Sequence, residues 1–228
     1  MLYSEDRKFV LVAVPKTGSS TLQKHLLDID PNLRRNAVCD TNGNWIELPT
    51  HATAVQIRAA MGSRAKKFTF VGFLRDPRDV VVSKYYFYRK GRAARQHGIV
   101  SRLARNPETK GRVFRPGTIL RVLSAQILPL RLWAQLYPYK SSAYFITDAH
   151  GTVLVDRIGR MERLQKDALA IFTDFGYAPE DLQLGRENCT DYDRSVTCDP
   201  RVAKIVARRL PEDCALFDHL TNAERTIA

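Results

Sequence analysis

The chain has 228 residues, of which 44% are hydrophobic, and is long enough to bury one sizeable core. Its formal charge of +12 indicates anionic partners or ligands and leaves nucleic acid, acidic membrane, polyanionic sugar and phosphorylated cofactor open. No stretch reaches the roughly 20 apolar residues of a membrane span, and the first residues lack the apolar segment of a signal peptide, so we expect a cytoplasmic protein, although an exported catalytic domain fits the same pattern.

The first 90 residues alternate between short apolar runs and amphipathic segments. In chain order they predict a buried strand at 8–14, a helix at about 20–27, an irregular segment at 28–50, a helix at 53–61, a second buried strand at 68–74 and a helix from Asp76-Pro77 to about residue 89. An almost wholly apolar run is typical of a strand that is covered on both faces. Strand, helix, strand, helix predicts an α/β fold with a parallel sheet.

The rest of the chain begins with a strongly basic segment, residues 90–117, which we expect to be a long loop or a lid. The pattern then predicts a helix at 118–137, a third strand at 143–147, a helix at 161–175 and a last, basic helix at 200–210. There is no internal repeat, and we expect a single domain over residues 1–228.

The four cysteines do not suggest a metal site. Cys39, Cys189, Cys198 and Cys214 form no CxxC pair and have no histidine at zinc-finger spacing. Four buried free thiols are one interpretation, and a bridge between Cys189 and Cys198 in an exported protein is the other.

The stretch VAVPKTGSSTL, residues 12–22, runs from a strand through a Gly/Ser/Thr loop into a helix. In the nucleotide-hydrolase pattern GxxxxGK[ST] the lysine follows the second glycine, whereas Lys16 precedes Gly18, so the usual ATP loop is not matched. Backbone N–H groups from Thr17 to Thr21, their hydroxyls and the helix dipole nevertheless suit a phosphate. The alternative is a strand-to-helix turn with hydroxyl caps.

A second stretch, LRDPRDVVVSKYY at 74–86, predicts a further phosphate site. Arg75 stands at the C-terminal end of the second strand, where open α/β sheets bind ligands, and Ser83 lies about two turns into the following helix. A guanidinium fork matches phosphate oxygens. Two such sites suit a nucleotide that is phosphorylated at both ends; an ion pair between Arg75 and Asp79 is the alternative.

These two stretches resemble a known family. PKTGSSTL is similar to the 5′-phosphosulfate loop of the sulfotransferases that use 3′-phosphoadenosine 5′-phosphosulfate (PAPS), and FLRDPRDVVVSKYYFY is similar to their 3′-phosphate motif. Residues 158–167 resemble the start of the family's late helix, and residues 188–217 resemble the carbohydrate-type, family 2-like branch. The likeness leaves residues 28–48 and 90–117 unmatched. It implies a three-layer, P-loop-like fold with a central parallel sheet flanked by helices.

The resemblance also implies the reaction. The sulfuryl group passes in line from PAPS to an acceptor hydroxyl, PAP is released, and no metal is required. Lys16 matches the lysine near the bridging oxygen, where an ammonium stabilises the leaving phosphate. The implied 5′-phosphate contacts are Lys16, Thr17, Gly18, Ser19, Ser20 and Thr21, and the implied 3′-phosphate contacts are Arg75 and Ser83.

A base for the acceptor proton is also needed, and His51 is the best-placed histidine. It precedes the helix at 53–61, where relatives often carry such a histidine, while Glu47 is a fallback and a histidine that only satisfies a loop carbonyl is the alternative. Met161 stands where soluble relatives have a tyrosine against the adenine, so it is either a purine contact or a core residue. Arg186 is a candidate for a further phosphate contact.

The acceptor is not determined by the sequence. The basic segment is either a solvated loop or a lid over an acidic acceptor such as an anionic glycan, and a small molecule fits as well. No nucleic-acid-binding motif accompanies the charge, so we do not expect nucleic acid as a partner; the oligomeric state is open. Two alternatives remain: a P-loop small-molecule kinase, with Asp76 near the strand end for magnesium, and a non-catalytic polyanion-binding protein.

Overall fold

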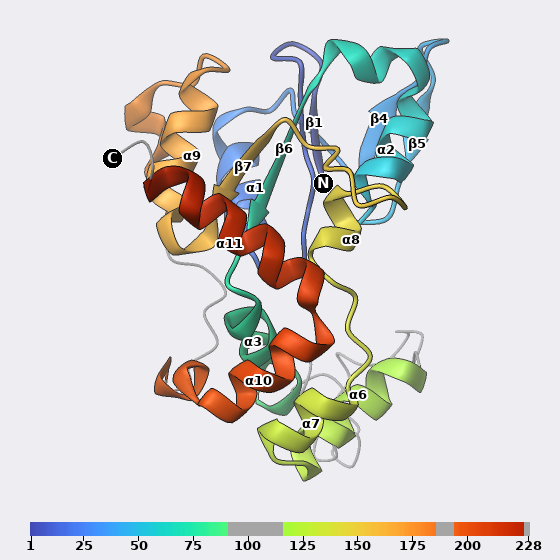
Figure 1. The fold of residues 1–228 in the computed structure, drawn as a ribbon. Coiled ribbons are helices and arrows are strands. Elements are labelled where there is room, and N and C mark those ends of the chain that lie inside the picture. The colour runs from blue at the N-terminus through green and yellow to red at the C-terminus, as the bar shows by residue number, and fades with distance from the viewer. Residues whose placement is uncertain (91–115, 186–193, 226–228) are drawn as a thin grey trace, which may run out of the picture. The chain divides into compact units, whose positions relative to one another are not determined.

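A five-stranded sheet combines four strands from the first 75 residues with one at 157–160 in a computed structural model, which describes residues 1–90, 116–185 and 194–225 (Figure 1). The strand order is β3-β1-β2-β6-β7. Its strands are β1 (Leu2–Ser4), β2 (Phe9–Leu11), β3 (Arg34–Arg35), β6 (Thr69–Leu74) and β7 (Arg157–Arg160). Only β2, β6 and β7 are parallel, whereas β1 is antiparallel to both of its neighbours. The prediction of an α/β fold is confirmed, but the sheet is mixed.

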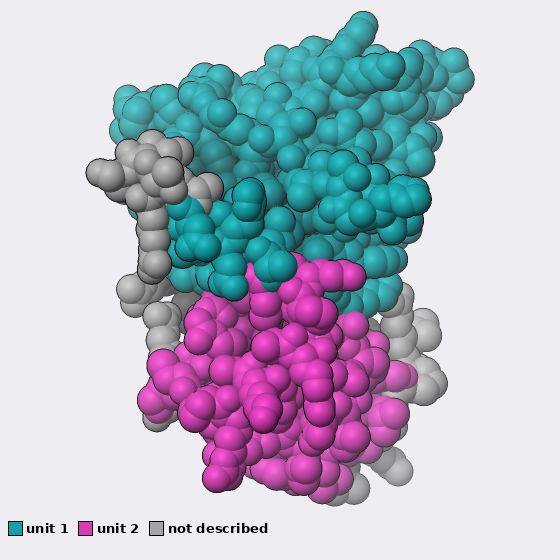
Figure 2. Space-filling model, viewed as in Figure 1, with its two compact units in different colours: residues 1–75, 140–188, 215–228 teal, residues 76–139, 189–214 magenta. Residues whose placement is uncertain are grey.

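By its contacts, the chain divides into two compact units, which Figure 2 shows in different colours. Unit 1 comprises residues 1–75, 140–188 and 215–228, and unit 2 comprises residues 76–139 and 189–214. The prediction of a single domain stays a prediction.

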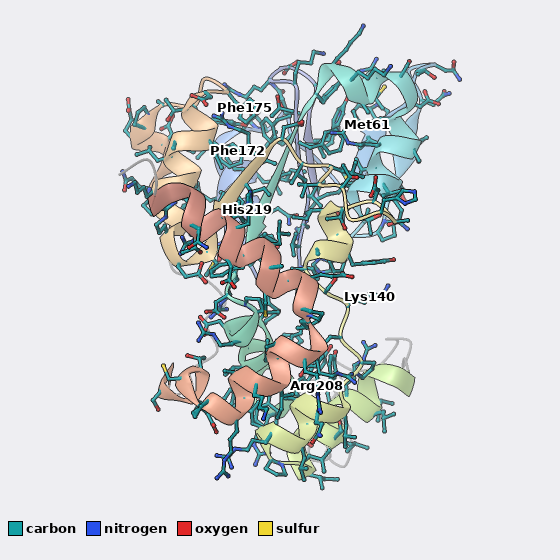
Figure 3. The ribbon with its side chains drawn as sticks, in the orientation of Figure 1. Met61, Lys140, Phe172, Phe175, Arg208 and His219 are labelled. Atoms are coloured by element: carbon teal, nitrogen blue, oxygen red, sulfur yellow. The ribbon has the colours of Figure 1, made fainter. Side chains whose placement is uncertain are left out.

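Helices pack on both faces of the sheet in unit 1. They are α1 (Ser19–Ile29), α2 (Ala54–Met61), α8 (Ala143–Ile146), α9 (Leu164–Thr173) and the part of α11 (Pro211–Arg225) that belongs to this unit, with 3-10 turns at Gly62–Lys67, Met161–Arg163 and Pro179–Leu182. Alternate residues of β2 face opposite sides: Phe9 packs with Phe172 of α9, and Val10 packs in the same cluster as Met61 of α2. Figure 3 labels Phe172 and Met61 on the two sides.

Local capping signals locate the predicted helices well. Thr53 Oγ1 accepts from the Gln56 backbone N–H while the Gln56 side chain accepts from Thr53 N–H, which is a complete capping box for α2. Asp76 accepts from Arg78 N–H, with Pro77 at the first position of α3 (Pro77–Arg89). The helices predicted at 20–27, 53–61, 76–89, 161–175 and 200–210 are therefore confirmed, with small shifts at their ends.

Two elements predicted in unit 1 are wrong. Residues 143–147 form the helix α8 and its C-cap Thr147 rather than a strand, because Ser141 Oγ accepts from Tyr144 N–H and Thr147 Oγ1 donates to Ala143 O. Thr147 makes only an isolated bridge, to Val153. The third parallel strand is β7 instead. The segment predicted as irregular, 28–50, also contains a hairpin of β4 (Ala37–Cys39) and β5 (Trp45–Glu47).

Unit 2 is helical. It contains α3, α6 (Pro116–Ile127), α7 (Leu130–Leu136), a 3-10 turn at Arg194–Cys198, α10 (Pro200–Arg209) and the first residues of α11. The single helix predicted at 118–137 is two helices, because Pro129 has no N–H to continue the first. Trp133, 1% exposed, lies at the centre of the unit 2 core, where Tyr85 and Tyr137 contact its ring.

Three cysteines are described, and all are free thiols. Cys39 is buried and Cys214 is partly buried, but Cys198 is exposed, so the prediction of four buried thiols is wrong at that position. Cys189 and most of the basic segment, residues 91–115, lie outside the described residues. Within the described ranges, no helix combines the length and apolar character needed to cross a membrane.

Lys84 on α3 gives unit 2 a predicted pH dependence. Burial lowers the pKa of Lys84 from 10.5 to about 8; the Arg121 charge acts in the same direction, while Asp213 opposes it. Between about pH 8 and 10.5 the unfolded chain binds more protons than the folded one, so the free energy of unfolding should rise with pH, by up to about 3 kcal/mol. Lys84→Met should remove that rise in urea unfolding measured from pH 7 to 9.5. The exposed Lys66→Met is the control, and parallel pH curves for wild type and Lys84→Met would contradict the expectation.

Candidate functional site

Three neighbouring parallel strands end at one edge of the sheet, and most candidate residues follow those ends. β2 leads into the loop at Pro15, β6 leads into Arg75, and β7 leads into Met161. Val12 N–H still donates to Val71 O at 2.8 Å, so the pairing of β2 with β6 continues almost to the loop. The prediction that Arg75 stands at the C-terminal end of a strand is confirmed.

The loop turns sharply before α1. Lys16 has φ 71° and Gly18 has φ 77°, both in the left-handed region, and α1 begins at Ser19. For lysine this backbone conformation is strained, whereas glycine adopts it freely. Because α1 begins within a few residues of the strand end, its first backbone N–H groups and the positive end of its dipole lie near that end, as an anion site requires.

Two loop hydroxyls are directed inward. Thr17 Oγ1 and Ser19 Oγ each donate to Val14 O at 3.0 Å, and the two residues are 0% and 4% exposed. Their hydroxyl protons therefore fasten the loop to the end of the strand. Ser20 is exposed, so a ligand at this loop would meet the Ser20 hydroxyl and the backbone N–H groups first, with Thr21 buried just behind.

Arg75 and Lys16 meet at the same edge. Arg75 Nη1 donates a long hydrogen bond, 3.5 Å, to the Lys16 carbonyl oxygen. The bond places a guanidinium beside the residue that carries the loop's ammonium. Two positive charges thus belong to two adjacent strand ends, an arrangement that attracts an anion.

Met161 also lies at this loop. Its sulfur lies so close to Gly18 that a Cβ there would overlap it, and Leu164 Cδ2 would be 3.1 Å from that Cβ. Only glycine fits there without displacing Met161. The sequence left Met161 as either a purine contact or a core residue, and in the structure it lies half-buried against the loop.

His51 lies against the strand that enters the loop. The Ala13 carbonyl can only accept, so His51 Nδ1 carries the proton and donates to Ala13 O at 2.6 Å. The exposed ring packs edge-to-face against Phe145, with 6.3 Å between centroids. In a neutral ring with this tautomer, the lone pair is on Nε2. The fallback, Glu47, is exposed on β5 opposite Ala37.

The remaining predicted residues are placed elsewhere. Ser83 is 6% exposed on α3 in unit 2, and Arg186 lies outside the described residues. Asp76 accepts from both the backbone and the side chain of Arg78. Desolvation alone would raise the pKa of Asp76, but these hydrogen bonds outweigh it and hold that pKa below its usual value, so Asp76 is an ionised partner of Arg78.

Arg160 is a strand-end residue that sequence reasoning did not single out. It ends β7, pairs in register with Leu74, and its guanidinium lies 5.2 Å from the Phe217 ring centroid. Its backbone N–H donates to the buried Asp167 at 2.8 Å. The sequence before it, Asp156 to Gly159, is too short and too polar to predict a strand, so the pattern that identified Arg75 was absent here.

Comparisons with protein-family models, curated proteins and solved structures find no match for this chain.

The close approach of Met161 to Gly18 is testable by substitution. Gly18→Ala should lower the free energy of unfolding by about 2 to 4 kcal/mol, because it combines left-handed strain with an overlap against the methionine sulfur. Gly43→Ala is the matched control: its φ is +85°, nothing lies within 4 Å of its Cβ position, and it should lose only about 1 to 2 kcal/mol. Adding Met161→Ala should recover the difference in urea unfolding, whereas equal losses for the two alanine variants would refute the contact.

Proposed function

We propose that the chain is a PAPS-dependent sulfotransferase that transfers a sulfuryl group to the hydroxyl of a carbohydrate or small-molecule acceptor. The observation that carries the proposal is the common location of three groups in unit 1: the Lys16 loop, Arg75 bonded to the Lys16 carbonyl, and His51 bonded to Ala13. The resemblance assigns these same residues to donor binding and to proton removal. The P-loop-like form of the fold belongs to the same proposal.

The reaction requires three things of the chain: correct positioning of the donor and the acceptor, stabilisation of the leaving phosphate, and a base for the acceptor proton. The acceptor oxygen forms the new O–S bond as the bond from sulfur to the bridging phosphate oxygen breaks, and the hydroxyl proton passes to His51 Nε2. Lys16 stabilises the negative charge that develops on the leaving phosphate. The Nδ1 hydrogen bond to Ala13 fixes the tautomer that this step needs.

The donor would be held mainly by backbone groups. Because Thr17 and Ser19 donate to Val14 O, the 5′-phosphosulfate would be held by the N–H groups at the start of α1 and by the Ser20 hydroxyl. Arg75 would hold the 3′-phosphate. Ser83 is assigned to the same phosphate only because its spacing from Arg75 in the sequence matches the family's motif. Arg160 lies at a neighbouring strand end, with its guanidinium 3.9 Å from the Glu162 carboxylate.

The kinase alternative is less well supported. Its magnesium would need Asp76, and that carboxylate caps α3 and is paired with Arg78. A magnesium ion would have to compete with both interactions. The polyanion-binding alternative is supported only by the net charge of +12.

Thermal unfolding with PAP tests the donor site. Saturating PAP without magnesium should raise the melting temperature by several degrees, because a ligand at about 100 times its Kd stabilises the folded state by about 2.7 kcal/mol. Lys16→Ala and Arg75→Ala should each reduce this shift, and Lys24→Ala, at an exposed position of α1, should not.

A shift with magnesium and ATP but none with PAP would instead favour the kinase. Salt-sensitive heparin binding that is unaffected by PAP, with no PAP shift, would favour the polyanion-binding protein.

Turnover of labelled PAPS with a panel of hydroxyl acceptors tests the chemical roles. His51→Ala should lower turnover by about 10²- to 10⁴-fold and leave the PAP shift unchanged, because only the base is removed. His219→Ala, at an exposed position of α11 that Figure 3 labels, is the control and should be silent. Retained turnover in the double variant Lys16→Ala, Arg75→Ala would refute the site.

A further inference from the structure

The α6–α7 hairpin, which consists of α6, α7 and the two residues between them, exposes much apolar surface. Eight large apolar side chains are exposed in the described parts of the chain, and four of them lie on this hairpin. They are Leu120 (69% exposed), Ile127 (73%), Leu132 (49%) and Leu136 (68%).

These four side chains face away from the core of unit 2. Leu120 and Ile127 are seven residues apart on α6, and Leu132 and Leu136 are four apart on α7, so each pair shares one helix face. The opposite faces carry the buried Val122, Ala125 and Ala134 of the same helices. Each helix of the hairpin is thus apolar on two faces, and its exposed face covers no core formed by the residues that the structure describes.

Positive charge borders the hairpin on α10. Arg209 Nη2 donates to Tyr137 O at 2.9 Å, and Arg131 of α7 pairs with Asp199 at 2.8 Å, so the ends of α10 are fastened to the ends of α7. The exposed basic side chains along α10 include Arg201, Lys204 and Arg208, the last of which is labelled in Figure 3.

We propose that the α6–α7 hairpin and α10 form a docking surface for the face of an anionic lipid bilayer. The four aliphatic side chains enter the boundary between headgroups and acyl chains, and the basic side chains of α10 pair with lipid phosphates and carboxylates. A helix with exposed Leu and Ile beside Lys and Arg is the usual composition of a segment that lies on a membrane without crossing it.

The charge favours a membrane over a second copy of the chain. In a two-fold contact the same surface meets itself, so the basic side chains of α10 would approach their own copies and repel. Single-stranded nucleic acid is also a poorer fit, because aliphatic side chains offer no ring on which a base can stack. An anionic bilayer satisfies the apolar and the basic parts together.

Co-sedimentation of the full chain with vesicles tests the proposal. The chain should bind phosphatidylcholine vesicles that contain about one third phosphatidylserine, should bind pure phosphatidylcholine much more weakly, and should release as salt rises. The fourfold variant Leu120→Gln, Ile127→Gln, Leu132→Gln, Leu136→Gln should bind at least about 100-fold more weakly. The triple variant Arg201→Gln, Lys204→Gln, Arg208→Gln should lose about fivefold per residue.

Matched controls come from exposed positions of unit 1. Val55→Gln with Val153→Gln removes exposed aliphatic side chains, and Lys66→Gln, Lys67→Gln, Lys166→Gln removes three exposed charges; both should bind as wild type does. Thermal unfolding reports whether the variants fold. If the fourfold variant does not fold, the single variant Leu136→Gln takes its place in the binding measurement.

Three results would overturn the proposal: no binding of wild type to the anionic vesicles, equal binding to neutral vesicles, or unchanged binding of the fourfold variant. Light scattering after size exclusion distinguishes the competing occupant. A wild-type dimer that the fourfold variant abolishes, without vesicle binding, would assign the surface to a second copy of the chain.

Discussion

The parallel pairing of β6 with β2 on one side and β7 on the other is the constraint on which the candidate site depends. It makes the three strands end at one edge, so the Lys16 loop, Arg75 and Arg160 follow strand ends that are neighbours in the sheet. The pairing also requires Gly159 on β7, since a Cβ there would overlap the Phe73 ring. A change that displaced β7 would disturb all three strand ends together, because β6 lies between β2 and β7.

The candidate site is fastened largely by main-chain acceptors. Val14 O receives two hydroxyls, Lys16 O receives a guanidinium, and Ala13 O receives an imidazole. These carbonyls belong to the few residues at which the strand ends and the loop begins, so their directions are set by one short piece of backbone. Side chains whose orientation is fixed in this way lose little entropy when a ligand binds.

The parts of the fold that were predictable from sequence are those with local signals. The capping box of Thr53 and Gln56 and the Asp76-Pro77 start locate two helices within a residue or two. The antiparallel addition of β1 was not predictable, because a three-residue strand finds its partners through contacts far along the chain. Residues 143–147 have the composition of a strand, but the Ser141 and Thr147 hydrogen bonds favour a helical turn.

The same division applies to the site. Arg75 was predictable because its position follows from the end of an apolar run. The inward direction of the Thr17 and Ser19 hydroxyls was not, since it depends on where the Val14 carbonyl points after the chain has turned. The contact between Met161 and Gly18 joins residues more than a hundred positions apart. The local hydrophobic pattern of a sequence does not predict contacts between residues so far apart.

The left-handed backbone at Lys16 sets stability against function at a single position. Glycine would relieve the strain there and would cost the loop its ammonium, so selection for stability alone would favour replacing the lysine. A lysine held in this conformation is the feature expected where a side chain is kept for its charge. If the protein were engineered for heat resistance, a screen for stability would therefore select substitutions at position 16, and a glycine selected there would remove the positive charge of Lys16.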